Sequence, residues 1–351
     1  MAPNYFAPTF KIEINGNRLA ADVSKHIQRV SVVSRLDRQD MMDTSSLTLV
    51  NAYPEMRWTH NEQDRSLLAI GNTVAIQMGY VGEEQDLFFG DVTSVSANFP
   101  ASGTPTVDIE GRSWLHRLTR VTRTRPFVNS TDKQIVEKVI SGGNYGLTAD
   151  VADTQIVYPS MPQNNKNDLD FLLERAASIG FRVRVAGKTL FFRPAAEDKV
   201  VIATFEWGKS LQSFRPMMNA NGQVNQVTVR GYDPLLKQAI VGRYPTGGGE
   251  GSGGPQVAEE AFGPGEEMHG DCPIFSEDEA RRRAQSIYEE RVRSFLTGTG
   301  TIIGMPALRA GMVVELKNLG QFSGQFRLTE VRHDLGGSGY TTSFNGEWVT
   351  P

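Results

Sequence analysis

Two stretches near the ends of this chain carry the same order of glycine and apolar residues, and this repetition limits the folds open to it. The first contains Gly71-x-x-Val74-x-Ile76, Phe88-x-Gly90-x-Val92 and Val95, and closes at Gly111. The second contains Gly311-x-x-Val314-x-Leu316, Phe322-x-Gly324-x-Phe326 and Val331, and closes at Gly346. Alternating apolar residues are typical of strands with one buried face, and the glycines suit tight turns between strands. We therefore predict two similar β modules in one chain, although unrelated β segments with glycine turns can also share such a pattern.

The region between the two copies has a mixed helical and strand pattern. Residues 131–140 place apolar side chains at helical spacing behind a Thr131–Gln134 capping box, with Gly142 as the stop. Residues 167–179 form a stronger helix pattern, which Asn167 can cap and Gly180 can end. Two short strands, FRVRV and TLFFRP, follow it. The middle of the chain is therefore predicted to be an α+β insertion.

These patterns predict a β-rich α+β fold with three parts. Residues 1–115 are the first tube-like β-barrel module, residues 116–200 the α+β insertion, and residues 201–351 the second module. The second module contains a Gly-rich stretch at 242–256 that cannot bury enough apolar surface to stay ordered. It also contains a helix at 276–295, which a Ser276–Glu279 capping box begins.

Composition excludes several classes of protein. The formal net charge is −4 and the sequence pI is about 5.8, which gives no general attraction to nucleic acid. Cys272 is the single cysteine, so no intrachain disulfide can form. Neither a secretory signal nor an apolar run of roughly 18 residues is visible, which predicts synthesis in the cytoplasm and no membrane span.

Two glycine motifs resemble nucleotide-binding loops only by letter. Gly249-x-Gly251-x-x-Gly254 would need a strand before it and a helix after it to form a dinucleotide site, but Pro255 follows it and the run is mostly glycine. Gly208-Lys209-Ser210 resembles the end of a phosphate loop, but Ala203 stands where the first glycine is required. We interpret the first as a flexible loop and the second as a turn after Trp207.

Candidate metal and hydrolytic residues are incomplete as well. His269-x-x-Cys272 offers two ligands where a structural zinc site needs four, and the other histidines, His26, His60, His116 and His333, are scattered. Ser113 does not lie in a nucleophile elbow. The acids Glu83, Glu84 and Asp86 are interpreted as a solvated loop. The prediction is that the chain has no catalytic, cofactor-binding or metal-binding residues.

Charge is concentrated in two stretches. The basic one contains His116 and five arginines: Arg112, Arg117, Arg120, Arg123 and Arg125. The acidic one runs from Glu259 to Glu279. Because no aromatic interleaving accompanies the arginines, nucleic-acid binding is less favoured than charge complementarity between subunits or toward a tube.

Two stretches resemble the late control protein D family of contractile phage tails, which shares its architecture with the hub half of type VI secretion VgrG spike proteins. One is Gln163–Phe181 (QNNKNDLDFLLERAASIGF), a polar lead-in, an Asp-x-x-Phe-Leu helix and a closing glycine. The other is the tail of the chain, with Gly304-Met-Pro306, Gly311, Phe322-Ser-Gly324, Val331-x-His333, Gly339-Tyr-Thr-Thr342 and Phe344. Together with the layout, the likeness extends over most of the chain.

The resemblance implies a baseplate hub of a phage tail or contractile injection system. In that family three chains form a homotrimer with pseudo-six-fold symmetry, which adapts a hexameric inner tube to a trimeric spike beside other baseplate proteins. It implies no cofactor and no enzymatic activity, assembly in the bacterial cytoplasm, and incorporation into the virion or injection particle. Because the chain stops soon after the second module, the spike is expected on a separate polypeptide. The alternatives are a β-scaffold glycan hydrolase or a carbohydrate-binding tail protein. The first would need convergent acids in a cleft, and the second an aromatic cluster, whereas Trp58, Trp114, Trp207 and Trp348 are scattered.

The glycine-rich stretch gives a first testable prediction. Deletion of residues 247–254 should leave the protein folded, because glycine and serine supply no core side chains. Circular dichroism and thermal unfolding of the deletion variant check this, and limited proteolysis should cut the parent chain there. Loss of the folded state on deletion would contradict the interpretation.

Overall fold

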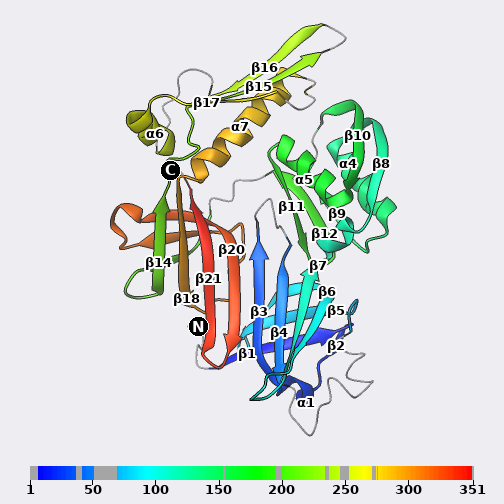
Figure 1. Ribbon diagram of the computed structural model, residues 1–351, viewed down its shortest axis with the longest axis vertical. Helices are drawn as coiled ribbons and strands as arrows, with labels where there is room; N and C mark the ends of the chain where they lie inside the picture. Colours follow the sequence, from blue (N-terminus) through cyan, green and yellow to red (C-terminus); the bar gives the residue numbers. More distant parts are fainter. Residues whose placement is uncertain are drawn as a thin grey trace.

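The structure is a computed structural model that describes residues 7–36, 42–50, 69–152, 155–194, 200–233, 237–245, 253–270, 274 and 276–349. These residues form mostly antiparallel β-sheet with few helices, which confirms the predicted β-rich α+β class. A 13-stranded sheet fills one end of the molecule, and two smaller units stand at the other end (Figure 1).

The first half of the large sheet comes from the N-terminal region. Its strands alternate inner and outer side chains; in β4, for example, Ser45, Leu47 and Leu49 are buried while the residues between them are partly exposed. The buried set forms one core that includes Ile76, Met78 and Ile109. The elements are β1 Pro8–Ile14, β2 Asn17–Arg18, α1 Ala21–Ser24, β3 Ile27–Arg35, β4 Thr44–Val50, β5 Thr73–Tyr80, β6 Gln85–Asn98 and β7 Thr106–Ser113.

The second half of the sheet is built from strands of the C-terminal region. Phe326, Phe344 and Leu316 are almost fully buried in a core of its own. The elements are β13 Val201–Glu206, β14 Leu211–Met218, β18 Leu296–Ile303, β19 Val313–Lys317, the short 3-10 helix Gly320–Phe322, β20 Gly324–Gly336 and β21 Gly339–Trp348.

The two halves have the same strand order. The first runs β3-β4-β7-β6-β5-β1 and the second runs β14-β18-β21-β20-β19-β13. Each strand therefore has a counterpart: β3 and β14, β4 and β18, β7 and β21, β6 and β20, β5 and β19, β1 and β13. One pairing differs in direction, since β1 is antiparallel to β5 whereas β13 is parallel to β19.

The equivalence extends to single residues. Gly71 and Gly311 both have φ of 93°, a left-handed conformation that favours glycine. The Gly71 N–H donates to the Val92 carbonyl over 2.8 Å, and the Gly311 N–H donates to the Leu328 carbonyl over 2.7 Å. Each of these glycines therefore begins its hairpin against an equivalent residue of the longer strand.

Two β-bulges also recur at equivalent places. One interrupts the register between Val92 and Ser94 in β6, and its counterpart lies between Leu328 and Glu330 in β20. The bulged Thr93 Oγ1 donates to the Glu110 carbonyl at 3.4 Å, as Thr329 Oγ1 donates to the Asn345 carbonyl at 3.3 Å. The second pair of bulges lies between Ile27 and Arg29 in β3 and between Leu211 and Ser213 in β14. Since a bulge bends a strand and increases its twist, both halves are curved by the same device.

One detail of the predicted repeat is wrong. The sequence pattern aligned Gly90 with Gly324, but Val74 lies opposite Gly90 while its counterpart Val314 lies opposite Phe326. The hairpin glycines therefore occupy positions two residues apart. A Cβ on Gly90 would lie 2.1 Å from the Arg112 carbonyl oxygen, so glycine is required here because a side chain would clash with the neighbouring strand. The closing glycines do correspond, because Gly111 lies opposite Val92 and Gly346 opposite Leu328.

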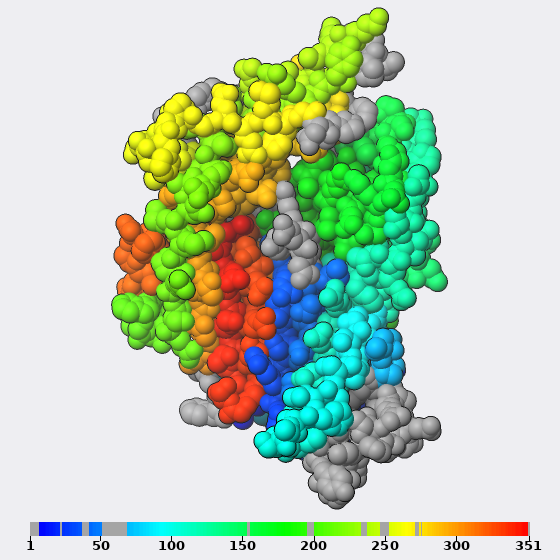
Figure 2. All heavy atoms as spheres, in the orientation of Figure 1, coloured from blue at the N-terminus to red at the C-terminus, as the bar shows by residue number. Residues whose placement is uncertain are grey.

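The predicted barrels do not close. Strand β20 has two partners on one side: its first residues pair with β19, and Glu330–Gly336 pair with β3. The two halves therefore merge into a single open sheet. Figure 2 shows the red and orange strands of the C-terminal half against the blue strands of the N-terminal half.

The insertion forms a separate unit with its own core, which includes Tyr158, Leu172 and Phe192. The Thr131 capping box and the Asn167 cap are both present as predicted. Gly142 does not stop the first helix, which continues to Gly143 and is ended by Asn144 in a left-handed conformation. The elements are the 3-10 helix Trp114–Thr119, β8 Thr122–Thr131, α4 Asp132–Gly143, β9 Thr148–Val151, β10 Val157–Asn167, α5 Asp168–Ser178, β11 Phe181–Ala186 and β12 Thr189–Pro194.

A fourth unit interrupts the second half of the sheet, and the sequence did not predict it. Strands β15 Gln226–Asp233, β16 Gln238–Tyr244 and β17 Glu266–His269 form a small sheet against α7 Glu277–Arg293, with α6 Gly254–Phe262 beside it (Figure 1). The predicted helix at 276–295 corresponds to α7, whose Ser276 cap accepts from the Glu279 N–H. The ends of the 242–256 stretch belong to β16 and α6, and residues 246–252 lie outside the described residues.

The equivalent closing glycines offer a test of local packing. A Cβ at Gly111 would lie 2.5 Å from Ser45 Oγ, whereas at Gly346 the nearest atom is 3.3 Å away. We expect Gly111→Ala to lower the free energy of unfolding by about 1–3 kcal/mol through overpacking, and Gly346→Ala to lower it by less. Denaturant unfolding of both variants measures this, and equal losses would contradict the described packing.

Candidate assembly surfaces

The joint between the two half-sheets is held by charge as well as by backbone pairing. Arg29 Nη2 lies 2.7 Å from Asp334 Oδ1, and Arg35 Nε lies 2.9 Å from Glu330 Oε2. Both ion pairs connect β3 to β20. Because exposed ion pairs each contribute less than about 1 kcal/mol, they add mainly to the selectivity of this pairing.

The inner face of this joint contains a buried histidine. His333 Nε2 lies 3.1 Å from the Leu308 carbonyl oxygen and therefore carries the proton. Its Nδ1 then accepts hydrogen bonds from the hydroxyls of Tyr340 at 2.9 Å and Thr342 at 3.1 Å. Burial, with the nearby positive charge of Arg309, lowers the pKa of His333 to about 3, so the ring is neutral at pH 7.

The far half of β6 is an unpaired edge. Its Ser94–Asn98 segment pairs with β7 on one side, and no strand among the described residues pairs with the other side. Apolar side chains are exposed there: Val95 is 42% exposed, and Phe99, just beyond the strand, is 60% exposed. An unpaired strand with exposed apolar groups is a ready site for pairing with another chain.

Strand β14 is a second unpaired edge, at the opposite end of the sheet (Figure 1). It pairs with β18 alone among the described strands. Met217 is 59% and Met218 is 48% exposed. The sequence does not predict either edge, because exposure depends on which strands are left without a neighbour.

Two residues of the basic stretch, His116 and Arg117, contact the carboxylate of Asp91. Asp91 accepts hydrogen bonds from Trp114 Nε1 at 2.9 Å and Arg117 Nε at 2.7 Å, and its Oδ2 lies 2.8 Å from His116 Nε2. These hydrogen bonds and the Arg117 charge lower the pKa of Asp91 to about 2, against the opposing effect of burial. Arg112 lies nearby with its side chain exposed.

Two further arginines of the basic stretch lie at Asp168. Arg125 Nη2 lies 2.8 Å from this carboxylate and Arg123 Nε lies 3.5 Å away, and the Tyr145 hydroxyl donates to it over 2.5 Å. Asp168 is fully buried at the start of α5. The predicted basic surface is therefore reduced to Arg112 and Arg120, for which the described residues provide no ion pair.

The acidic stretch is likewise partly paired. Glu267 forms hydrogen bonds with Arg291 Nε at 2.9 Å and Nη2 at 2.8 Å, and these lower the pKa of Glu267. Glu259 accepts from Asn225. Residues 271–273 and 275 of this stretch lie outside the described residues.

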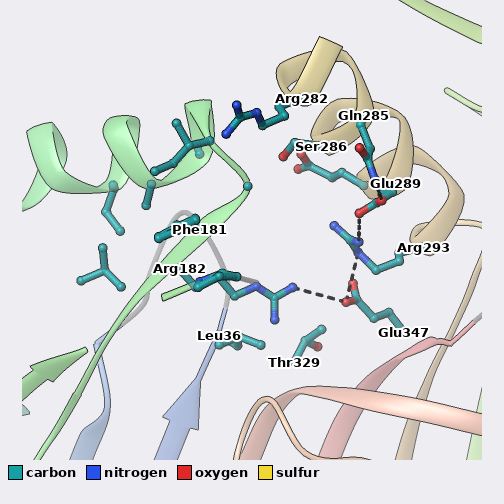
Figure 3. Close-up of a pocket in the computed structure, with 18 residues that line it drawn as sticks. Leu36, Phe181, Arg182, Arg282, Gln285, Ser286, Glu289, Arg293, Thr329 and Glu347 are labelled. Atoms are coloured by element: carbon teal, nitrogen blue, oxygen red, sulfur yellow. Dashed lines mark hydrogen bonds and ion pairs between the residues drawn. The ribbon is translucent and has the colours of Figure 1, made fainter. Parts of the chain in front are cut away.

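A cleft of about 670 Å³ separates the insertion from α7 and the large sheet. Figure 3 shows Arg182 of β11 and Arg293 of α7 turned toward Glu347 of β21, with nitrogen–oxygen distances of 4.0 Å and 3.5 Å. Arg293 also lies 3.6 Å from Glu289. These ion pairs connect the insertion, the fourth unit and the large sheet across the cleft.

A family model described as the Alg8 N-terminal domain matches residues 6–336. The chain belongs to the Alg8 N-terminal domain family. No curated protein matches the chain.

Three solved structures share the fold of this Alg8 N-terminal domain family member at low sequence identity. The 43 kDa tail protein of prophage MuSo2 from Shewanella oneidensis has a TM-score of 0.73 and 13% identity, over 97% of this chain and 98% of that one. A tail protein from Neisseria meningitidis has a TM-score of 0.72 and 13% identity, over 97% of each chain. An E. coli component of the type VI secretion system has a TM-score of 0.60 and 11% identity, over 97% of this chain and 77% of that one.

The candidate hydrolytic, phosphate-binding and metal-binding residues of the sequence do not come together in the described part of this family member. Ser113 is buried at the end of β7, Glu84 pairs with Lys11 at 3.0 Å, and Asp86 accepts from Gln77. Lys209 and Ser210 lie in a turn beside Glu206. His269 contacts Glu267, while Cys272 and His60 lie outside the described residues. Within the described ranges, no cluster of three metal-ligating side chains occurs and no helix has the length and apolar character of a membrane span.

The lowered pKa of His333 predicts how the folding stability of the protein depends on pH. Its folded pKa of about 3 lies below the ordinary 6.5, so the unfolded chain binds the proton first and stability falls as the pH drops below about 6.5. When the pH falls from 6.5 to 5, the free energy of unfolding of the His333→Gln variant should decrease by roughly 2 kcal/mol less than that of the parent chain. Urea unfolding at both pH values measures the difference.

Asp43 supplies the matched control, because burial raises its pKa to about 6. Its contribution has the opposite sign: it is complete below the unfolded pKa of about 4 and is lost as the pH rises through 6. Asp43→Asn should therefore steepen the loss of stability on acidification. An unchanged slope in His333→Gln would show that the histidine titrates normally in the folded state.

Proposed function

We propose that this chain is a structural ring subunit, the baseplate hub of a contractile phage tail or contractile injection system. Three copies would form a homotrimer that connects a hexameric inner tube to a trimeric spike, alongside other baseplate proteins. The observation that supports this most is the repeated strand order within one chain. Three chains with two equivalent half-sheets present six similar units around a three-fold axis, which is what an adaptor between the two symmetries needs.

The insertion and the fourth unit strengthen the case for an adaptor. Each occurs once per chain, so a trimer carries three of each around six similar half-sheets. The fold likeness to two phage tail proteins and a type VI secretion component supports the same role at the level of architecture. Assembly would take place in the bacterial cytoplasm, and the subunit would become part of the virion or injection particle.

The competing functions gain no support from the described residues. A glycan hydrolase needs two carboxylates facing one another across a cleft, and two of the acids that line the cleft beside α7, Glu289 and Glu347, are instead paired with Arg293. A carbohydrate site needs grouped exposed aromatic rings. Trp114 lies against Arg117, Trp207 is exposed alone on the far half-sheet, and Trp58 lies outside the described residues.

The stoichiometry of an assembled particle tests this function. Expressed with its neighbouring tube and spike proteins, the chain should appear as three copies per particle in a cryo-EM reconstruction, between six tube subunits and one three-fold spike. Native mass spectrometry of the isolated hub–spike complex should give three chains. Six copies of the chain per particle would contradict the proposal, as would its absence from the tube–spike junction.

A further inference from the structure

The internal joint between β20 and β3 has an unused counterpart on the surface of the same chain. Strand β20 corresponds to β6, and β3 corresponds to β14. The part of β20 that pairs with β3, Glu330–Gly336, corresponds to the unpaired far half of β6. The counterpart of β3, strand β14, has an unpaired side as well. Each chain therefore holds one completed joint and the two separated halves of another.

We propose that the far half of β6 pairs with β14 of a second copy of this chain, in the register of the internal joint. This inference rests on the proposed ring and specifies how its subunits meet. The two edges lie at opposite sides of the sheet, so one chain cannot satisfy both by itself, whereas a closed ring of copies leaves neither exposed.

The register follows from pairings within the chain. Ile109 of β7 and Phe344 of β21 are equivalent, and they lie opposite Leu47 and Gly300. Leu47 lies opposite Val30 of β3, and Gly300 lies opposite Phe214 of β14. Val30 and Phe214 are therefore equivalent. The bulges at equivalent places in both strands keep this alignment along their length.

Transfer of the internal register to the open edges pairs apolar side chains on the core face. The internal contacts are Val331 with Ser34, His333 with Val32, and Leu335 with Val30. Their counterparts place Val95 opposite Met218, Ala97 opposite Pro216, and Phe99 opposite Phe214.

All six counterparts are apolar, and Val95, Phe99 and Met218 are among the exposed large apolar residues of the isolated chain. Burying them at about 25 cal/mol per Å² supplies a driving force that backbone pairing alone lacks. On the other face, Ser96 meets Met217 and Asn98 meets Arg215, which leaves that face largely polar.

Pro216 of β14 is compatible with the proposed pairing, at the loss of one inter-strand hydrogen bond. The Leu36 N–H donates to the Thr329 carbonyl over 2.8 Å, so alternate N–H groups of β3 point toward β20, including that of Val32. Its counterpart Pro216 has no N–H to donate, while Phe214 and Met218 retain theirs. Strand prolines occur at edges, and here the proline also limits pairing with unrelated strands.

Charge distinguishes the two kinds of joint. The ion pairs of the internal joint, Arg29 with Asp334 and Arg35 with Glu330, have uncharged counterparts between copies. Ser213 and Asn98 take the places of Arg29 and Asp334, and Asn219 and Ser94 take those of Arg35 and Glu330. The acids that pair with the arginines of β3 lie on β20, and their counterparts on β6 are uncharged. Strand β6 of another copy therefore does not compete with β20 for β3.

Disulfide trapping tests the register. In a Cys272→Ser background, Ser96→Cys and Met217→Cys together place two thiols at a non-hydrogen-bonded pair, where Cβ atoms lie close enough for a disulfide. In particles assembled with tube and spike proteins, mild oxidation should convert most chains into a covalent trimer on non-reducing gels. Each single-cysteine variant should give none.

Matched variants control for register and reactivity. Arg332→Cys with Val33→Cys is the equivalent pair of the internal joint and should form an intrachain disulfide, visible as a mobility shift. Ala97→Cys with Met217→Cys puts the thiols on opposite faces and should not cross-link. Ser94→Cys with Met217→Cys would link only if the strands slipped by two residues.

The outcomes separate this inference from the function on which it rests. Three copies per particle without the Ser96–Met217 link, or with the slipped link, would overturn the proposed joint and leave the trimeric hub standing. A dimer that does not close to a trimer would also overturn it. A copy number other than three would overturn the proposed function itself.

Discussion

The continuity of the large sheet depends on β20 having two partners on the same side. Its first residues pair with β19 and its last residues pair with β3, so one continuous strand belongs to both half-sheets. The bulge at Leu328–Glu330 marks the change between the two partners. Without this exchange the chain would hold two separate sheets, each with its own exposed edge.

The buried contents of the joint explain why it is specific. His333 is enclosed with both ring nitrogens bonded, and it donates to a carbonyl on a loop of its own half-sheet. A neutral, fully bonded histidine is tolerated in a core, whereas an unsatisfied one would be costly. A one-residue slip between β20 and β3 would carry this ring to the polar face, which ties register to hydrogen bonding as well as to hydrophobic burial.

Much of the fold could be predicted from local patterns, and the misses have physical causes. The helix caps at Thr131, Asn167 and Ser276 were correct because capping depends on a few neighbouring residues. The Gly71 and Gly311 equivalence was correct because a left-handed turn demands glycine. The alignment of Gly90 with Gly324 failed because Gly90 is required by close contact with the adjacent strand, and a linear sequence pattern does not show which strands are adjacent. The unit around α7 and the two open edges were missed for the same reason, since both are defined by which strands pair. The basic stretch from Arg112 to Arg125 predicts a charged surface, yet Asp91 and Asp168, distant in sequence, pair with most of its residues.

The antiparallel joint between β20 and β3 also has a mechanical meaning. Its hydrogen bonds lie across the strands, so a pull along the strand direction loads all of them at once in shear, while a pull across the sheet opens them one after another. The joint is therefore far more resistant to sliding than to peeling. A sheet wall built from such joints would transmit a thrust along its strands with little deformation and would yield, if at all, by parting sideways.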